Sequence, residues 1–116
     1  MDIKRHEPSK ILANAVEHGN TVYLAGIVAE DASADIKGQT QQILNKIDRL
    51  LATCGSNKSR LLSANIWVTD IQNRAAMNEV WTAWVDPANL PVRACVEARL
   101  ADPRLLVEIM VVAAKG

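Results

Sequence analysis

Residues 90–113 constrain the fold more than any other part of the chain, because they predict two adjacent β-strands of different character. The strand at residues 93–100 divides by polarity, with Arg93, Cys95, Glu97 and Arg99 on one side and smaller apolar residues on the other. The strand at residues 106–113 is mainly apolar on both sides. Arg93 and Glu108 are both expected on the face where a lone domain would not place its core. That face therefore meets either water or another subunit and a small charged ligand.

The remaining sequence predicts two amphipathic helices and three more strands. The expected strands are residues 11–17, 21–29, 61–70, 93–100 and 106–113, the first two forming a hairpin. The first helix is expected to begin at Ser33 or Asp35 and to end at Gly55. The second is expected to begin at Asp70 or Asn73 and to end near Val85, before Asp86-Pro87.

This order of elements, β-β-α-β-α-β-β, predicts one α+β domain over residues 1–116. Both helices have a single apolar face to bury, and one mixed β-sheet with both helices on one face covers them. The β-α-β connections predict some parallel pairing with right-handed crossovers. Leu62, Ala64, Ile66 and Val68 are expected to share one face of their strand.

A second apolar face on this sheet predicts an oligomer. Its expected members are Tyr23, Ile27, Trp67, Met110 and Val112. Burial of apolar surface stabilises a protein by about 25 cal/mol per Å². A stripe of this kind is therefore expected to be covered by another copy of the chain, packed sheet against sheet.

The charge balance and the absence of long apolar runs exclude several classes of function. Lys plus Arg equal Asp plus Glu at 13 each, so the formal net charge is zero and nucleic-acid binding is not favoured. No signal peptide is readable, and no segment approaches the ~20 apolar residues of a membrane span. Cys54 and Cys95 fit a reducing compartment, although their number alone permits one disulfide. We expect a soluble cytoplasmic protein that does not contact membranes.

Four segments carry a resemblance to a known family. They are Gly55 to Ser59, Ala75 to Asn78 followed by Trp81 and Trp84, Pro91-Val92-Arg93, and Val107-Glu108-Ile109. The chain resembles the RidA/YjgF family of enamine/imine deaminases, formerly called L-PSP endoribonucleases, and most of all its YoaB-like branch. The resemblance implies a chorismate-mutase-like fold and a homotrimer with clefts between subunits. It also implies cofactor-independent hydrolysis of 2-aminoacrylate and related imines to 2-keto acids and ammonia.

The resemblance also assigns roles to individual residues. It implies that Arg93 grips the substrate carboxylate, that Glu108 positions the attacking water, and that Cys95 contacts substrate through its backbone. Leu12 aligns with a tyrosine, and Ala25 with a serine, that normally touch the ligand in this family. These two departures affect substrate preference and rate, while the carboxylate anchor and the water-positioning group are retained.

Each residue also has a simpler interpretation. Arg93 could form an interface ion pair, and Glu108 could pair with an arginine for structure. Cys95 lacks a histidine in the sequence that would activate it, which favours a packing role for its side chain. His6 and His18 show no metal-ligand spacing, so no metal is expected. Asn78 is expected to face solvent more readily than a site.

Three functions remain open at this point. The first is a deaminase with Arg93 as anchor and Glu108 guiding water. The second is a non-catalytic module that binds a 2-keto acid or similar metabolite, which Leu12 and Ala25 make credible. The third is a ribonuclease, against which the zero net charge argues.

Overall fold

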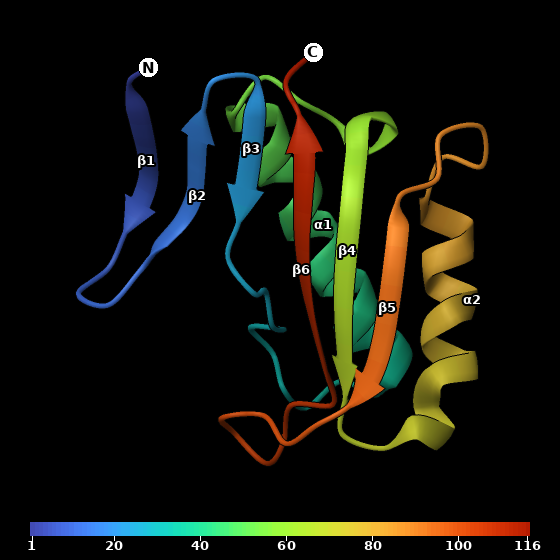
Figure 1. Ribbon diagram of the computed structural model, residues 1–116. Coiled ribbons are helices and arrows are strands. Elements are labelled where there is room, and N and C mark those ends of the chain that lie inside the picture. The colour runs from blue at the N-terminus through green and yellow to red at the C-terminus, as the bar shows by residue number, and fades with distance from the viewer.

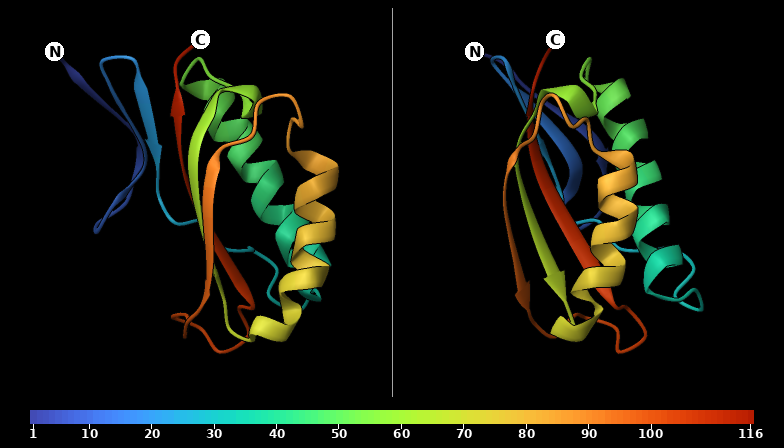
Figure 2. Two further views of the ribbon diagram at one scale, coloured as in Figure 1. Left: turned by 45° about the vertical axis from the view of Figure 1, so that its right-hand side comes forward. Right: turned by 90° about the vertical axis from the view of Figure 1, so that its right-hand side faces the viewer.

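The computed structural model describes residues 1–116 and contains one six-stranded sheet with two helices against one of its faces (Figures 1 and 2). The strands are β1 Ile3–Pro8, β2 Ala13–His18, β3 Thr21–Leu24, β4 Leu61–Val68, β5 Val92–Glu97 and β6 Val107–Ala114. The helices are α1 Ile36–Thr53 and α2 Arg74–Trp84, with short 3-10 turns η1 Lys58–Arg60 and η2 Ile71–Asn73. The strand order is β1-β2-β3-β6-β4-β5, and the β4–β5 pair is parallel. The predicted mixed sheet with both helices on one face is confirmed.

Strand β1 was missing from the predicted order of elements. It pairs antiparallel with β2 at the edge of the sheet, and nearly all of its residues are exposed. An edge strand with little to bury has no reason to alternate in hydropathy, so its pattern gave no strand signal. Backbone pairing holds it, together with an ion pair of 2.8 Å between Glu7 Oε2 and Arg49 Nη1 on α1.

Helix α1 begins and ends where the sequence predicted. The Asp35 carboxylate caps it by accepting a hydrogen bond of 2.8 Å from the Gly38 backbone N–H. Gly55, just beyond its C-terminal cap, has φ of +75°, a left-handed conformation that favours glycine. The apolar side of α1 is fully buried against the sheet. Its residues are Ile43, Leu44, Ile47, Leu50 and Leu51. Neither helix offers a long enough apolar stretch to cross a membrane.

We call the side of the sheet beneath the helices the covered face. Strands β4 and β6 supply its centre, with Ala64, Ile66, Val68, Val107, Ile109, Val111 and Ala113 all buried. Helix α2 adds Met77, Trp81 and Trp84 to this core. Both cysteines are free thiols.

Two irregularities shift residues away from their predicted faces. In β4, Leu61 pairs with Ala113 and Ser63 pairs with Val112, so Leu62 bulges outward and is 49% exposed. After β3, Ile27 bridges Ile109, although Tyr23 pairs with Val112. Ile27 is four residues after Tyr23, whereas Ile109 is only three residues before Val112, so the segment after β3 contains one extra residue. This bulge turns the Ile27 side chain into the core, where it is 2% exposed. The prediction that Ile27 faces away from the helices was wrong.

The opposite side of the sheet, which we call the open face, is apolar and uncovered within one chain. Tyr23, Val92, Val96 and Met110 are between 39% and 73% exposed. Trp67 and Val112 lie among them and are half-buried. The predicted second apolar face is therefore present, with Val92 and Val96 in addition to four of its five expected members.

Candidate functional site

Arg93 lies on the edge strand β5, and its side chain contacts helix α2. Arg93 pairs with buried Ala64 on β4, so its side chain is on the covered face of the sheet. Because β5 is the edge strand, this side chain lies at the margin of the core and is only half-buried. Its Nη1 donates a hydrogen bond of 2.7 Å to Asn78 Oδ1, and its Cζ lies 5.4 Å from the centre of the Trp81 ring. The aromatic face and the amide hold a half-buried guanidinium in one orientation.

Glu108 lies on the other side of the sheet from Arg93. It pairs with Trp67 on β4 and faces outward between buried Val107 and Ile109. The expectation that Arg93 and Glu108 share a face was wrong. The reason is that Arg93 pairs with a core residue of β4 and so points to the same side as the core. Glu108 lies between two core residues of β6 and so points to the opposite side. One chain therefore does not bring the two charges together.

The bulge after β3 forms the immediate surroundings of Glu108. It places Gly26 so close to the glutamate that a Cβ at this position would overlap Glu108 Oε2. The backbone can approach the carboxylate only because residue 26 has no side chain. Sequence reasoning missed Gly26, since nothing in a regular strand pattern marks an inserted residue.

Ala25 lies next to Gly26, which approaches Glu108, whereas Leu12 lies in the loop before β2, and neither residue is on a strand next to β5. Ala25 immediately precedes Gly26, and its backbone N–H donates a hydrogen bond of 2.9 Å to the carbonyl of Asn14 at the start of β2. Leu12 precedes β2 and is 47% exposed. Both side chains are apolar, so neither position offers a side-chain hydroxyl to a ligand.

Cys95 lies two residues beyond Arg93, on the same side of β5. It pairs with Ile66 in register and packs, partly buried, against the core. The predicted packing role of its side chain fits this position. A possible contact between its backbone and a ligand remains a prediction.

Asn78 is the residue that sequence reasoning placed least well. It was expected to face solvent, but it is half-buried and holds Arg93. A hollow of about 290 Å³ opens beside it, lined by Ile71, Gln72, Arg74, Ala75 and Asn78. The available signal was its place in the Ala75 to Asn78 segment, one helical turn before Trp81.

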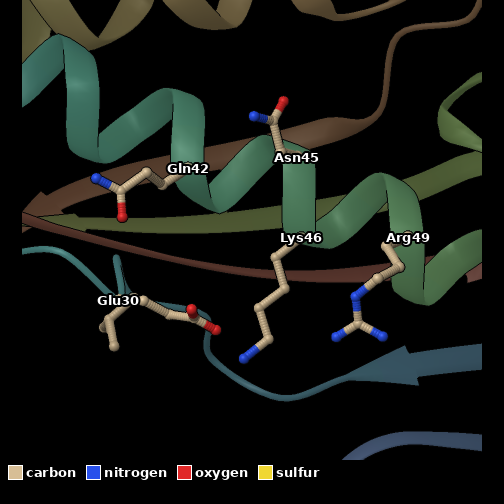
Figure 3. Close-up of a pocket in the computed structure, with 6 residues that line it drawn as sticks. Glu30, Gln42, Asn45, Lys46 and Arg49 are labelled. Atoms are coloured by element: carbon tan, nitrogen blue, oxygen red, sulfur yellow. The ribbon is translucent and has the colours of Figure 1, made fainter.

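A separate polar groove lies between α1 and the loop after β3 (Figure 3). It has a volume of about 340 Å³ and is lined by Val28, Glu30, Gln42, Asn45, Lys46 and Arg49. Arg49 donates a hydrogen bond to Glu7. This hydrogen bond holds the pKa of the Glu7 carboxyl below its ordinary value. The groove contains none of the predicted site residues, and we assign it no role.

Metal-ligating side chains do not gather around Arg93 or Glu108. A single group of three such side chains occurs, formed by His6, Glu17 and Cys54. Burial, as the main cause, raises the pKa of the Cys54 thiol. The expectation of no metal rested on sequence spacing, and spacing cannot reveal residues that come together from three separate elements.

Comparison with known proteins gives consistent results over the whole chain. A family model described as endoribonuclease L-PSP matches residues 3–115. A RutC family protein of Haemophilus influenzae is 44% identical over 114 residues, covering 97% of this chain and 98% of its own. RutC family protein YoaB of Escherichia coli is 43% identical over 114 residues, covering 98% and 99%.

Solved structures agree with these sequence matches. An uncharacterized protein from Pseudomonas aeruginosa superposes with a TM-score of 0.96 at 46% identity, covering 99% of this chain and all of its own. A member of the YjgF protein family from Neisseria meningitidis superposes with a TM-score of 0.97 at 42% identity, covering 100% and 97%.

Proposed function

Since the chain belongs to the endoribonuclease L-PSP family, which includes the YjgF and RutC proteins, we propose that it hydrolyses small enamines and imines to 2-keto acids and ammonia. The substrates would be of the 2-aminoacrylate type. The observation that carries this proposal is the orientation of Arg93 by Asn78 and Trp81. The family assignment sets the broad class of protein, and the reaction is our inference from the site.

Arg93 is suited to bind the carboxylate of such a substrate. A guanidinium has five N–H donors in a plane, and Asn78 takes only a bond from Nη1. The remaining donors can form two parallel bonds to a carboxylate. Two-point binding fixes both the position and the orientation of the adjacent carbon, which the attacking water must reach.

Glu108 is suited to move the proton. In the proposed reaction, water adds to the imine carbon while Glu108 accepts a proton from that water. Glu108 returns that proton to the imine nitrogen, which gives a carbinolamine. Glu108 then accepts the proton of the carbinolamine hydroxyl and donates it to the amine, so the C–N bond breaks, the carbonyl forms and ammonia leaves. The products are one 2-keto acid and one ammonia for each imine and water consumed. General acid–base groups contribute about 10²–10⁴-fold in rate.

A neighbouring copy of the chain must complete this site, because Arg93 and Glu108 lie on opposite sides of one sheet. We propose a homotrimer in which the open face of one subunit meets the β5–α2 edge of the next. The exposed apolar residues of the open face support such packing. The cleft then contains Arg93 from one subunit and Glu108 from the other.

The test is the release of pyruvate and ammonia from 2-aminoacrylate, generated in situ by a serine or threonine dehydratase. We expect wild type to accelerate release, and Arg93→Ala and Arg93→Lys each to reduce kcat/KM by about 100-fold or more, because lysine lacks the two-point geometry. Glu108→Gln should lower kcat by about 10²–10⁴-fold. Unchanged turnover in Arg93→Ala would refute the assignment.

Mixed oligomers test the shared site directly. Arg93→Ala and Glu108→Gln subunits are unfolded together, mixed in equal amounts and refolded. If each site takes one residue from each of two subunits, about one quarter of the sites in random trimers regain both groups. Recovery of activity toward that fraction supports the intersubunit site, whereas no recovery in well-assembled trimers argues for a site within one chain.

Ribonuclease activity is the second candidate, because the matching family carries that description. The formal net charge of zero argues against a phosphate-binding surface. RNA cleavage by purified wild type that disappears in Arg93→Ala would restore this candidate. Ligand-dependent thermal stabilisation by 2-keto acids without turnover would instead favour a binding module, which apolar Leu12 and Ala25 also permit.

A further inference from the structure

Three metal-ligating side chains from distant parts of the sequence meet at the β1–β2 hairpin. His6 lies on β1, Glu17 on β2, and Cys54 at the C-terminal cap of α1. His6 Nε2 is 2.5 Å from Glu17 Oε2, and the ligand atoms of all three residues lie within 4.8 Å of one another. The group is on the covered face, whereas Glu108 is on the open face.

The types of atom in this cluster favour one kind of cation. An imidazole nitrogen, a thiol sulfur and a carboxylate oxygen are a combination that zinc accepts, whereas magnesium and calcium take oxygen ligands. In a tetrahedral zinc site, neighbouring ligand atoms are about 3.5 Å apart, given Zn–N and Zn–S bonds of roughly 2.0 and 2.3 Å. The His6–Glu17 contact is shorter than that value and the outer limit of 4.8 Å is longer, so an ion would replace the direct His6–Glu17 contact after rotation of the side chains.

The surroundings orient the carboxylate toward His6 and leave one side of the cluster open to solvent. Cys54 is 2% and Glu17 7% exposed, whereas the His6 side chain is 22% exposed and leaves a way in from solvent. Lys115 Nζ lies 2.7 Å from Glu17 Oε1, the oxygen that does not face His6. Lys115 thus holds the carboxylate with its other oxygen toward the imidazole, as outer-shell partners do in metal sites.

An ion pair alone explains only part of this arrangement. The His6–Glu17–Lys115 chain accounts for three polar side chains, and Cys54 packs in the core with its sulfur within 4.8 Å of the His6 and Glu17 ligand atoms. We propose that His6, Glu17 and Cys54 bind a zinc ion, with water in the fourth position. The ion joins the exposed edge strand β1 to the end of α1 and stabilises the hairpin, apart from the proposed reaction.

Cobalt(II) is the probe for this site, because it replaces zinc and reports tetrahedral geometry and thiolate ligation in its absorption spectrum. The full-length protein is reduced, stripped with chelator and titrated with cobalt(II). We expect one equivalent per chain, with a sulfur-to-cobalt charge-transfer band, and displacement by zinc. Absence of that band in the wild type overturns the proposal.

Matched variants identify the ligands. Cys54→Ser and His6→Gln should weaken cobalt(II) binding by about 100-fold or more, because loss of even an outer-shell partner costs 10–100-fold. Cys95→Ser and His18→Gln change the other cysteine and the other histidine of the chain, and they should leave binding unchanged. Binding that survives Cys54→Ser, or that is lost in Cys95→Ser, refutes the assignment.

A measurement on the wild type avoids dependence on variants that fold poorly. X-ray absorption of the zinc-loaded protein should show one sulfur at about 2.3 Å and the remaining ligands near 2.0–2.1 Å. A shell of nitrogen and oxygen only would exclude Cys54 and overturn the proposal. Zinc should also raise the melting temperature of wild type and of Cys95→Ser, but not that of Cys54→Ser.

Discussion

The two faces of β6 are built from alternate residues of one strand, yet different partners determine them. Val107, Ile109 and Val111 are fully buried beneath the helices. Their neighbours Glu108 and Met110 point to the open face, where Met110 is 39% exposed. The covered face is satisfied within the chain, whereas the open face has apolar side chains and a carboxylate with nothing over them. Packing within the chain thus accounts for the covered face, and we propose that assembly and chemistry account for the open face.

The largest effect on stability should come from the covered face. Ile109→Ala should lower the free energy of unfolding by about 2–5 kcal/mol, because it leaves a cavity that the surrounding core fills only in part. Urea denaturation at several protein concentrations measures this loss, which should not depend on concentration. Met110→Ala is the adjacent control on the open face, and an equal, concentration-independent loss there would contradict the distinction between the faces.

A charge on the open face should break assembly and leave the fold intact. Met110→Asp should raise the subunit dissociation constant by at least about 100-fold, since a buried unpaired charge costs several kcal/mol. Light scattering after size exclusion should then report monomers with an unchanged circular dichroism spectrum. Ala52→Asp places the same charge on an exposed residue of α1, on the helix side of the sheet, and it should leave the oligomer intact. Dissociation by both variants would remove the special role of this face.

The contact between Gly26 and Glu108 allows a sharper test of chemistry on the open face. Gly26→Ala should push the carboxylate aside and lower kcat/KM for 2-aminoacrylate by about 100-fold, since a displacement of about 1 Å can cost that much. The variant should remain folded, because the glutamate side chain can move toward the open face. Full activity in Gly26→Ala would show that the position of Glu108 is not critical.

The smallest effect should come from the loop that joins β5 to β6. Arg104 lowers the pKa of Asp102 from an ordinary 3.8 to about 2, chiefly by a side-chain hydrogen bond. A lowered carboxyl pKa stabilises the folded state above pH 3.8, and that contribution disappears as the pH falls through about 2. An NMR titration of Asp102 should show this midpoint, and Arg104→Gln should return it toward 3.8. The pair is on the surface, so any effect on stability near neutral pH should be small.

Periodicity and capping residues alone were enough to predict both helices, five of the six strands and an uncovered apolar face. These features depend on neighbours along the chain, for example the Asp35 carboxylate that caps α1 from three residues away. Strand β1 has no hydropathy pattern of this kind, because an exposed edge strand is held by backbone pairing and not by burial of its side chains.

The candidate site divides in the same way. The sequence singled out Arg93 and Glu108 through short motifs, and both remain the best candidates. It could not reveal that they lie on opposite sides of the sheet, because the side to which a residue points depends on how its strand pairs with the neighbouring strand. The roles of Asn78 and Gly26 depend on contacts with residues 15 and 82 positions away in the chain.

The sequence by itself therefore determined the secondary structure, the composition of the two sheet faces and the residue types available for chemistry. Only the tertiary structure decided which side chains meet. It brought Asn78 to Arg93 and Gly26 to Glu108, and it gathered His6, Glu17 and Cys54. The physical reason is that hydropathy and capping act over one or two turns of chain, whereas strand register and bulges are settled by packing of the whole sheet.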